Sequence, residues 1–289
     1  VAVTGASGYI GSRIVEDLLQ QGYEVHACVR DSSNEQKVNH LLELGKSSAN
    51  CNVKLFEGDL FKKGSYDKAF INCSTVIHAG ATVGFNRETP QEVYDGCFTE
   101  NEHVVESVIK SDSIKRLVFT SSFAAVAHPR PEGYVFDEKD WCGDNVEAYK
   151  GAWTTDNISK NRDIAYAMAK ANTEKYIYEV AEKDGNFEAI SINPLHVIGP
   201  LLTENHNQFF SWQFFILQLL KGVNFGSYNG QQVRSDRMLW NMVDVRDVAK
   251  AHRLAAESSN AKNGSRYILS ASDTSGEMFT CCLLYTSDA

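Results

Sequence analysis

The chain has 289 residues, of which 43% are hydrophobic and 22% charged, a composition ordinary for a globular protein with a large core. Its formal net charge of −9 argues against a nucleic-acid-binding surface, which needs clustered basic residues. No apolar run approaches the roughly 20 residues needed to span a bilayer, so we expect neither a nucleic acid nor a membrane as a partner.

The seven cysteines are scattered, with no Cys-x-x-Cys pair and no Cys/His spacing suited to zinc, so no metal site is expected. Cys28 lies in an apolar run and is predicted to be a small core residue rather than a reactive thiol. An odd, scattered set favours a reducing compartment, which predicts a cytoplasmic location.

Both ends of the sequence look cut. Residues 1–4 already read as a buried strand with no Met before them, so any targeting peptide would precede this sequence. Residues 282–289 (CLLYTSDA) resemble the translation of a widely used sequencing adapter. We therefore expect the native sequence to stop near Thr280.

Strands and helices alternate along the first two thirds of the chain. Residues 1–4 are apolar and β-branched, and a glycine turn leads from them into an amphipathic helix that carries Ile14, Leu18 and Leu19. Further strands are predicted at 24–29, 53–56, 75–78, 117–120 and 189–192, and further helices around 38–44, 93–109 and 162–170. This alternation predicts an α/β fold: a Rossmann-type, doubly wound parallel sheet with helices on both faces.

After Pro194 this alternation breaks. We assign residues 1–193 to the Rossmann domain and residues 194–280 mostly to a small substrate-binding subdomain, over the strand ends where open α/β sheets bind ligands. A helix predicted over 243–258 is free to pack back on the Rossmann domain. The aromatic residues between 209 and 215 are either a substrate lid or ordinary helix packing.

The first turn has glycines at positions 5, 8 and 11, in the spacing G-x-x-G-x-x-G. Glycine allows positive φ and close backbone approach, and a helix N-terminus offers free N–H groups to a pyrophosphate. Because the turn stands between a strand and a helix, it indicates a dinucleotide site, although packing glycines in a tight turn would look the same.

The second strand ends at Arg30 and Asp31. An acidic residue here would hold the ribose hydroxyls of NAD, whereas an arginine pairs with the 2′-phosphate of NADP. Arg30 comes first and Lys37 follows on the next helix, while Asp31 reads as a helix cap. The pattern favours NADP(H) over NAD(H).

Tyr166 and Lys170 stand one helical turn apart, so they share a helix face. A cation beside a tyrosine favours the deprotonated phenol and suits it to acid–base work. A chain of this composition contains about one such pair by chance, so the motifs around the pair decide whether it is a functional site. Ser121 and Ser122 end the fifth strand, where a hydroxyl either binds a substrate carbonyl or caps a turn.

Taken together, these elements resemble the extended short-chain dehydrogenase/reductase (NAD-dependent epimerase/dehydratase) family. The nearest branch is the dihydroflavonol reductase and cinnamoyl-CoA reductase-like group, which includes yeast-type methylglyoxal/aldehyde reductases. The resemblance runs to about Thr280. It is carried by TGASGYIG at 4–11, VRD at 29–31, GDL at 58–60, VIHAGA at 76–81, VFTSS at 118–122, FDEKDW at 136–141, NPLHVIGP at 193–200 and VDVRDVAKAH at 243–252.

The resemblance implies a role for each matching residue. Ser122 and Tyr166 would polarise a substrate carbonyl, and Lys170 would bind the nicotinamide ribose, with Ser121 the less favoured serine. The implied cofactor-binding residues, besides Tyr166 and Lys170, are Gly5, Ser7, Gly8, Tyr9, Ile10, Gly11, Arg30, Lys37, Asp59, Leu60, Ala79, Gly80, Ala81, Pro194 and Val197. The candidate substrate residues are Thr82, His128 and His196, whereas His78 is expected to be buried and hydrogen-bonded.

The resemblance implies an NADP(H)-dependent oxidoreductase of the carbonyl reductase type, acting on a small-molecule aldehyde or ketone as a monomer or homodimer. Alternatives are a nucleotide-sugar epimerase/dehydratase, a 3β-hydroxysteroid-type dehydrogenase and an NADP-sensing protein without catalysis. Ala127 stands where dihydroflavonol reductases carry a substrate-binding Asn, and the cysteine signature of cinnamoyl-CoA reductases is absent. The segments that choose the substrate (82–86, 123–128, 142–160 and 195–240) match no branch, so the sequence names no substrate.

Overall fold

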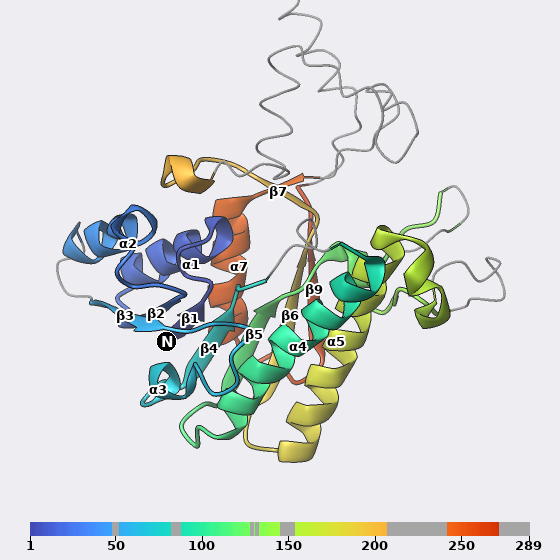
Figure 1. Cartoon of the computed structure of the whole chain (residues 1–289), viewed down its shortest axis with the longest axis horizontal. Helices are drawn as coiled ribbons and strands as arrows, with labels where there is room; N and C mark the ends of the chain where they lie inside the picture. The colour runs from blue at the N-terminus through green and yellow to red at the C-terminus, as the bar shows by residue number, and fades with distance from the viewer. Residues whose placement is uncertain are drawn as a thin grey trace, which may run out of the picture.

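The computed structural model (Figure 1) describes residues 1–47, 52–81, 88–127, 130, 133–144, 154–206 and 242–271. Within these residues, seven strands form one sheet in which every neighbouring pair is parallel. In spatial order they are β3 (Val53–Glu57), β2 (Val25–Val29), β1 (Ala2–Thr4), β4 (Thr75–His78), β5 (Arg116–Thr120), β6 (Glu188–Pro194) and β9 (Ser265–Leu269). The predicted doubly wound parallel sheet is confirmed.

Helices cover both faces of the sheet, as Figure 1 shows. One face packs on α1 (Tyr9–Gln20), α2 (Glu35–Ser47) and α7 (Val245–Glu257), and the other packs on α3 (Asp67–Phe70), α4 (Pro90–Ile109) and α5 (Arg162–Asp184). Neighbouring residues of a strand serve opposite cores: Leu117 and Phe119 contact the α4 side, and Val118 contacts the α7 side. Because both faces are covered, the strands are nearly continuous apolar runs.

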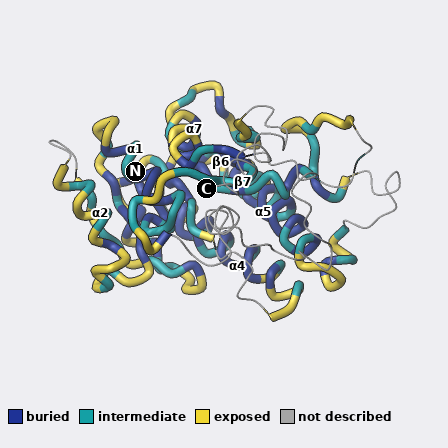
Figure 2. The backbone as a smooth tube through the Cα atoms, turned by 90° about the horizontal axis from the view of Figure 1, so that it is seen from above, coloured by how far each residue is buried: buried dark blue, intermediate teal, exposed yellow. Residues whose placement is uncertain are grey.

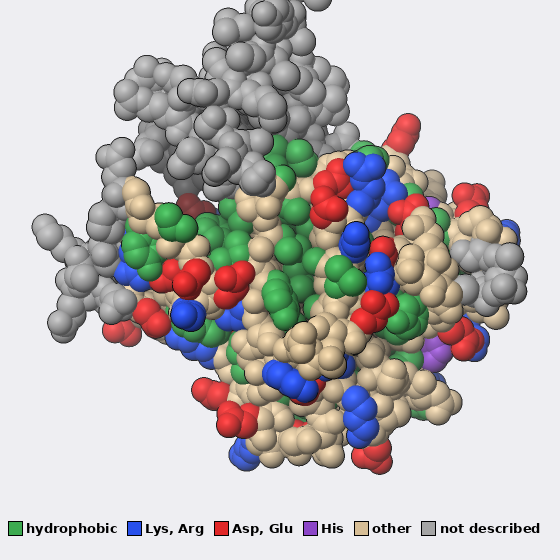
Figure 3. All heavy atoms as spheres, turned by 180° about the vertical axis from the view of Figure 1, so that it is seen from behind, with side chains coloured by type: hydrophobic (Ala, Val, Ile, Leu, Met, Phe, Trp, Pro, Cys, Tyr) green, Lys and Arg blue, Asp and Glu red, His purple; other side chains and the backbone are tan. Residues whose placement is uncertain are grey.

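Burial follows this layering. Figure 2 shows the buried backbone along the strands and the inner helix faces, with exposed segments at the rim. Cys28 is 1% exposed and lies in the core on the α3–α4 side, as expected for a small packing residue. On the opposite side of the molecule from that viewed in Figure 1, Lys and Arg side chains are interspersed with Asp and Glu (Figure 3).

The last predicted helix begins two residues later than expected. Met242, Val243 and Asp244 form strand β8 (Met242–Asp244), which pairs in parallel with β7 (His196–Ile198). Asp244 then caps α7 by accepting a hydrogen bond from the Arg246 N–H at 2.8 Å, and it forms an ion pair with the Arg246 side chain at 2.7 Å. The apolar run hides this boundary, and the capping aspartate marks it.

The segment after Pro194 returns to the main sheet twice. Helix α7, which was allowed to pack back, lies against α1, β5 and β6. Strand β9, which was not expected to return, hydrogen-bonds to β6, with Ile192 opposite Tyr267. A boundary at residue 194 therefore does not separate β9 from the Rossmann domain, and the aromatic residues 209–215 lie outside the described residues. No helix in the described part of the chain is both long and apolar enough to cross a membrane.

His252 joins α7 to the sheet from a fully buried position. Its Nδ1 lies 2.8 Å from the Val248 carbonyl and its Nε2 lies 2.8 Å from the Thr120 hydroxyl. Since a carbonyl only accepts hydrogen bonds, Nδ1 carries the proton and Thr120 donates to Nε2. Burial lowers the pKa of His252 to about 4.

This histidine makes the fold sensitive to acid. A folded-state pKa below the unfolded value stabilises the protein above about pH 6.5, and the contribution is lost as the pH falls toward 4. We expect urea unfolding to show a free energy that falls over this range, with His252 contributing about 1.4 kcal/mol per pH unit. His252→Gln should flatten this dependence.

Thr120→Val is the matched control, because it removes the partner and leaves the titrating group. It should lower stability at each pH while leaving the slope nearly unchanged. Equal slopes for the wild type and His252→Gln would contradict the assignment.

Candidate active site

The carboxyl ends of the parallel strands meet at one edge of the sheet, and most predicted site residues follow them directly. In the spatial order of the strands, these residues are Asp59 and Leu60 after β3, Arg30 after β2, Gly5 to Gly11 after β1, Ala79 to Ala81 after β4, Ser122 after β5, and Pro194 at the end of β6.

The turn after β1 leaves no room for side chains. Gly5 has a φ of +64°, and a Cβ there would lie 2.6 Å from the Cα of Gly80. A Cβ on Gly11 would lie 2.1 Å from the carbonyl oxygen of Gly5. No side chain caps the N-terminus of α1 at Gly8, so the first N–H groups of the helix are open to an anion. This turn fits the pyrophosphate of a dinucleotide.

The turn after β4 is held against the glycine turn by buried polar groups. The Thr4 hydroxyl accepts a hydrogen bond from the Gly80 N–H at 3.3 Å and lies 2.6 Å from Nδ1 of His78. His78 also hydrogen-bonds the side chain of Asn101, and burial together with the Lys170 charge lowers its pKa to about 3. His78 is thus buried and hydrogen-bonded, as expected, and through Thr4 it is linked to the backbone of Gly80.

The end of β2 presents two exposed cations. Asp31 accepts hydrogen bonds from the Ser33 hydroxyl at 2.6 Å and the Ser33 N–H at 2.9 Å, which lower its pKa. Its carboxylate is therefore engaged in the turn before α2. Arg30 and Lys37 are exposed, and neither side chain hydrogen-bonds or pairs with another of the described residues.

Asp59 and Leu60 extend the site along β3. The Asp59 carboxylate accepts a hydrogen bond from the Phe61 N–H at 3.0 Å, which orders the turn. Leu60 is buried, and its Cδ1 would lie 3.5 Å from a Cβ on Gly80. The β3 turn therefore reaches the turn after β4 across the sheet edge.

The two serines after β5 differ in whether the hydroxyl proton is free to bind a ligand. The Ser121 hydroxyl is buried and donates a short hydrogen bond to Glu174. Ser122 is half-buried, and its Oγ accepts a hydrogen bond from the Ala124 N–H at 3.1 Å, which leaves its own proton available to a ligand. Of the two hydroxyls, only that of Ser122 keeps a proton to donate into the site.

Tyr166 and Lys170 lie together on α5 as the spacing predicts. The ammonium nitrogen of Lys170 is 5.7 Å from the centre of the Tyr166 ring, and Lys170 is 7% exposed. Burial disfavours its charged form, but electrostatic interaction with neighbouring acidic groups outweighs burial and raises the pKa of Lys170. These groups are Tyr166, Cys97, Glu100 and Glu174. Lys170 is therefore a cation at neutral pH.

The segment after β6 runs back over the glycine turn. His196 and Val197 are half-buried in β7, and the Tyr9 hydroxyl donates to the Gly199 carbonyl at 2.9 Å. The Ser7 carbonyl lies 3.2 Å from Nε2 of His206. Thr82 and His128, two of the candidate substrate residues, lie outside the described residues.

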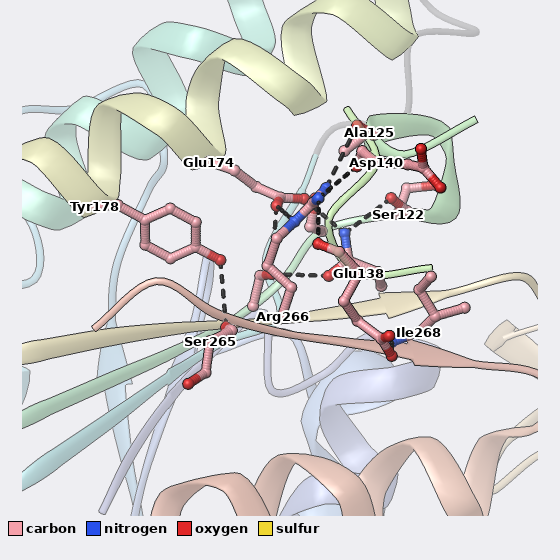
Figure 4. Close-up of polar contacts among 12 residues, drawn as sticks. Ser122, Ala125, Glu138, Asp140, Glu174, Tyr178, Ser265, Arg266 and Ile268 are labelled. Carbon is pink, nitrogen blue, oxygen red and sulfur yellow. Dashed lines mark hydrogen bonds and ion pairs between the residues drawn. The ribbon is translucent and has the colours of Figure 1, made fainter. Parts of the chain in front are cut away.

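Three further residues at this edge were not found from the sequence. Glu174, Asn193 and Arg266 form a polar network beside the two serines, as Figure 4 shows for Glu174 and Arg266 near Ser122. Glu174 had a signal: it stands four residues after Lys170, so a carboxylate occupies the same inward face of the helix. Arg266 had none, because it lies in a short strand far along the chain.

The chain is similar to known proteins over most of its length. Residues 1–270 match the NAD dependent epimerase/dehydratase family. A cinnamoyl-CoA reductase of Medicago truncatula is 35% identical over 266 residues, 90% of this chain and 73% of that protein. A dihydroflavonol 4-reductase of Gerbera hybrida is 35% identical over 280 residues, 94% of this chain and 68% of that protein.

Among solved structures, Gre2 of Candida albicans in complex with NADPH superposes with a TM-score of 0.74 at 25% identity, covering 93% of this chain and 77% of that one. The predicted resemblance to this family is confirmed. The chain belongs to the NAD dependent epimerase/dehydratase family, in the branch of the dihydroflavonol and cinnamoyl-CoA reductases.

Proposed function

We propose that this protein is an NADP(H)-dependent oxidoreductase that interconverts a small aldehyde or ketone with its alcohol. Three groups carry the proposal: a buried cation on Lys170, Tyr166 on the same helix face, and a Ser122 hydroxyl with a free proton on the loop that packs against that helix. The curated relatives are reductases of this class, as their names state.

The cofactor would lie along the strand ends. The N-terminus of α1 and the Gly5–Gly11 turn would bind its pyrophosphate, and Asp59 and Leu60 would flank the adenine side. Arg30 and Lys37 are free to bind a 2′-phosphate, whereas the acidic group that NAD would need, Asp31, is already engaged by Ser33. Ala79 to Ala81, Pro194 and Val197 would line the remaining path toward Tyr166 and Lys170.

The chemistry follows from the three groups. When bound, a reduced nicotinamide supplies a hydride to the carbonyl carbon. Tyr166 donates its proton to the carbonyl oxygen, and the Lys170 ammonium stabilises the phenolate that remains. Ser122 donates a hydrogen bond to the same oxygen and stabilises the charge that develops on it. In the reverse direction, Tyr166 accepts the proton of the alcohol.

The substrate is a small carbonyl compound, and the subdomain built from residues after Pro194 would select it. A panel of methylglyoxal and a dihydroflavonol offers aldehyde and ketone carbonyls, whose reduction gives an alcohol. Sugar nucleotides belong in a parallel thermal-shift assay, because protection by them would point to an epimerase instead.

Replacing Tyr166 by Phe tests the proton donor. Tyr166→Phe should retain NADPH binding, since the ring remains, but should lose on the order of 100-fold or more in kcat because the proton source is gone. Tyr176→Phe is the matched control: Tyr176 lies on the same helix and packs on Phe98, so this variant should keep wild-type turnover. An unchanged kcat in Tyr166→Phe would refute the assignment.

Replacing Arg30 by Gln tests the choice of cofactor. A charge-assisted contact to a 2′-phosphate is worth enough that Arg30→Gln should weaken NADPH binding by about 10-fold, with NADH affinity little changed. Lys46→Gln, at the far end of α2, removes the same charge and should leave both affinities unaltered. Titration of intrinsic fluorescence with each cofactor measures this, and equal losses for NADPH and NADH would exclude a 2′-phosphate contact.

A further inference from the structure

A buried ion pair lies directly behind the proposed active site. Nε of Arg266 donates to Oε2 of Glu174 at 2.8 Å, and the two side chains are 3% and 0% exposed. Glu174 belongs to α5 and Arg266 to β9, 92 residues later in the chain. A buried ion pair adds little net stability because both charges lose their hydration, so its geometry is the feature that needs an explanation.

The other oxygen of Glu174 holds the serine loop. Oε1 accepts a hydrogen bond from the Ser121 hydroxyl and another from Nδ2 of Asn193 at 2.6 Å. Nδ2 of Asn193 also donates to the Ser122 carbonyl at 3.1 Å. The amide orientation is defined, because Oδ1 of Asn193 accepts from the Ser191 hydroxyl at 2.7 Å and the reverse orientation would place an oxygen against the carboxylate.

Arg266 fastens the next loop to the same carboxylate. Nη1 donates to the carbonyls of Glu138 and Asp140 at 3.0 and 2.6 Å, and Nη2 donates to the Ala125 carbonyl at 3.4 Å. The guanidinium lies 3.6 Å from the ring centre of Trp141. Figure 4 shows these contacts converging on Arg266 from several loops.

Glu174 stands four residues after Lys170 and eight after Tyr166, so the three side chains occupy one face of α5. The proton-donating pair and the serine come from different elements, α5 and the loop after β5. The chain from Glu174 through Asn193 to the Ser122 carbonyl connects the helix to that loop beside the strand ends. A displacement of about 1 Å in such a group costs on the order of 100-fold in rate.

We propose that Glu174 and Asn193, with Glu174 locked by Arg266, are positioning residues that set Ser122 against Tyr166 and Lys170. The proposal rests on the proposed carbonyl reduction and adds residues to that site. Neither side chain takes part in the chemistry; they act on the backbone of Ser122 and the hydroxyl of Ser121.

The test is a double-mutant cycle between Asn193 and Ser122. With the panel carbonyl that the wild type reduces fastest, Asn193→Ala should lower kcat by about 10-fold or more while NADPH affinity and KM change little. In a Ser122→Ala background the same substitution should change kcat by less than about twofold, because no hydroxyl remains to position. Losses that multiply in the double variant would overturn the proposal.

Asn263→Ala is the matched control. Asn263 accepts a hydrogen bond from the Ala189 N–H at 3.2 Å and donates to the Tyr178 carbonyl at 3.1 Å, so it links β6 and α5 at their opposite ends. This variant should lose stability but keep its kcat. If kcat fell equally in Asn263→Ala and Asn193→Ala, the effect of Asn193 would be a general loss of stability, and the proposal would be overturned.

Glu174→Gln should also lower kcat while KM changes little. Its control is Glu188→Gln, which alters the Arg116–Glu188 ion pair at the opposite end of the same sheet and should leave kcat unchanged. If Glu174→Gln does not fold, the Asn193 cycle still decides. Turnover that is present in the wild type and absent in Tyr166→Phe, but unchanged in Asn193→Ala, would remove the positioning role alone. No carbonyl reduction by the wild type would instead refute the proposed function and this inference with it.

Discussion

The contact between the turns after β1 and β4 is the constraint on which the rest of the site depends. Backbone meets backbone there: a single Cβ on Gly5 would lie 2.6 Å from the Cα of Gly80. This approach sets the start of α1 against the strand end that carries Ala79 to Ala81. Because β1 pairs in parallel with both β2 and β4, the same arrangement brings the remaining strand ends to one edge.

Three buried polar side chains each have a hydrogen-bond partner on another element. His78 joins β4 to the Thr4 hydroxyl, His252 joins α7 to β5, and Glu174 joins α5 to β9. Such groups are costly when unpaired, so they tolerate little displacement. They make the sheet edge rigid without adding much stability, which suits a site that must hold several reacting groups in register.

Helix α5 connects this rigidity to the proposed chemistry. One face carries Tyr166, Lys170 and Glu174 at intervals of four residues, so one helix presents the proton donor, its cation and its anchor. Glu174 in turn pairs with Arg266 of β9, which brings a strand late in the chain to the proposed active site. Residues on both sides of position 194 therefore contribute to the proposed site, so a boundary at this position does not divide the chain by function.

The sequence by itself determined the order of β1 to β6 and of α1, α2, α4 and α5, the glycine turn and the tyrosine–lysine pair, because these depend on periodicities and on residues that stand close together in the chain. Asp244 marks the start of α7 by its capping hydrogen bond, whereas the apolar residues before it conceal strand β8. The return of β9 to the sheet and the Glu174–Arg266 pair were decided only by the tertiary structure. Each depends on hydrogen bonds between residues that lie far apart in the sequence. Local sequence preferences do not specify such partners, because the packing of the layers brings them together.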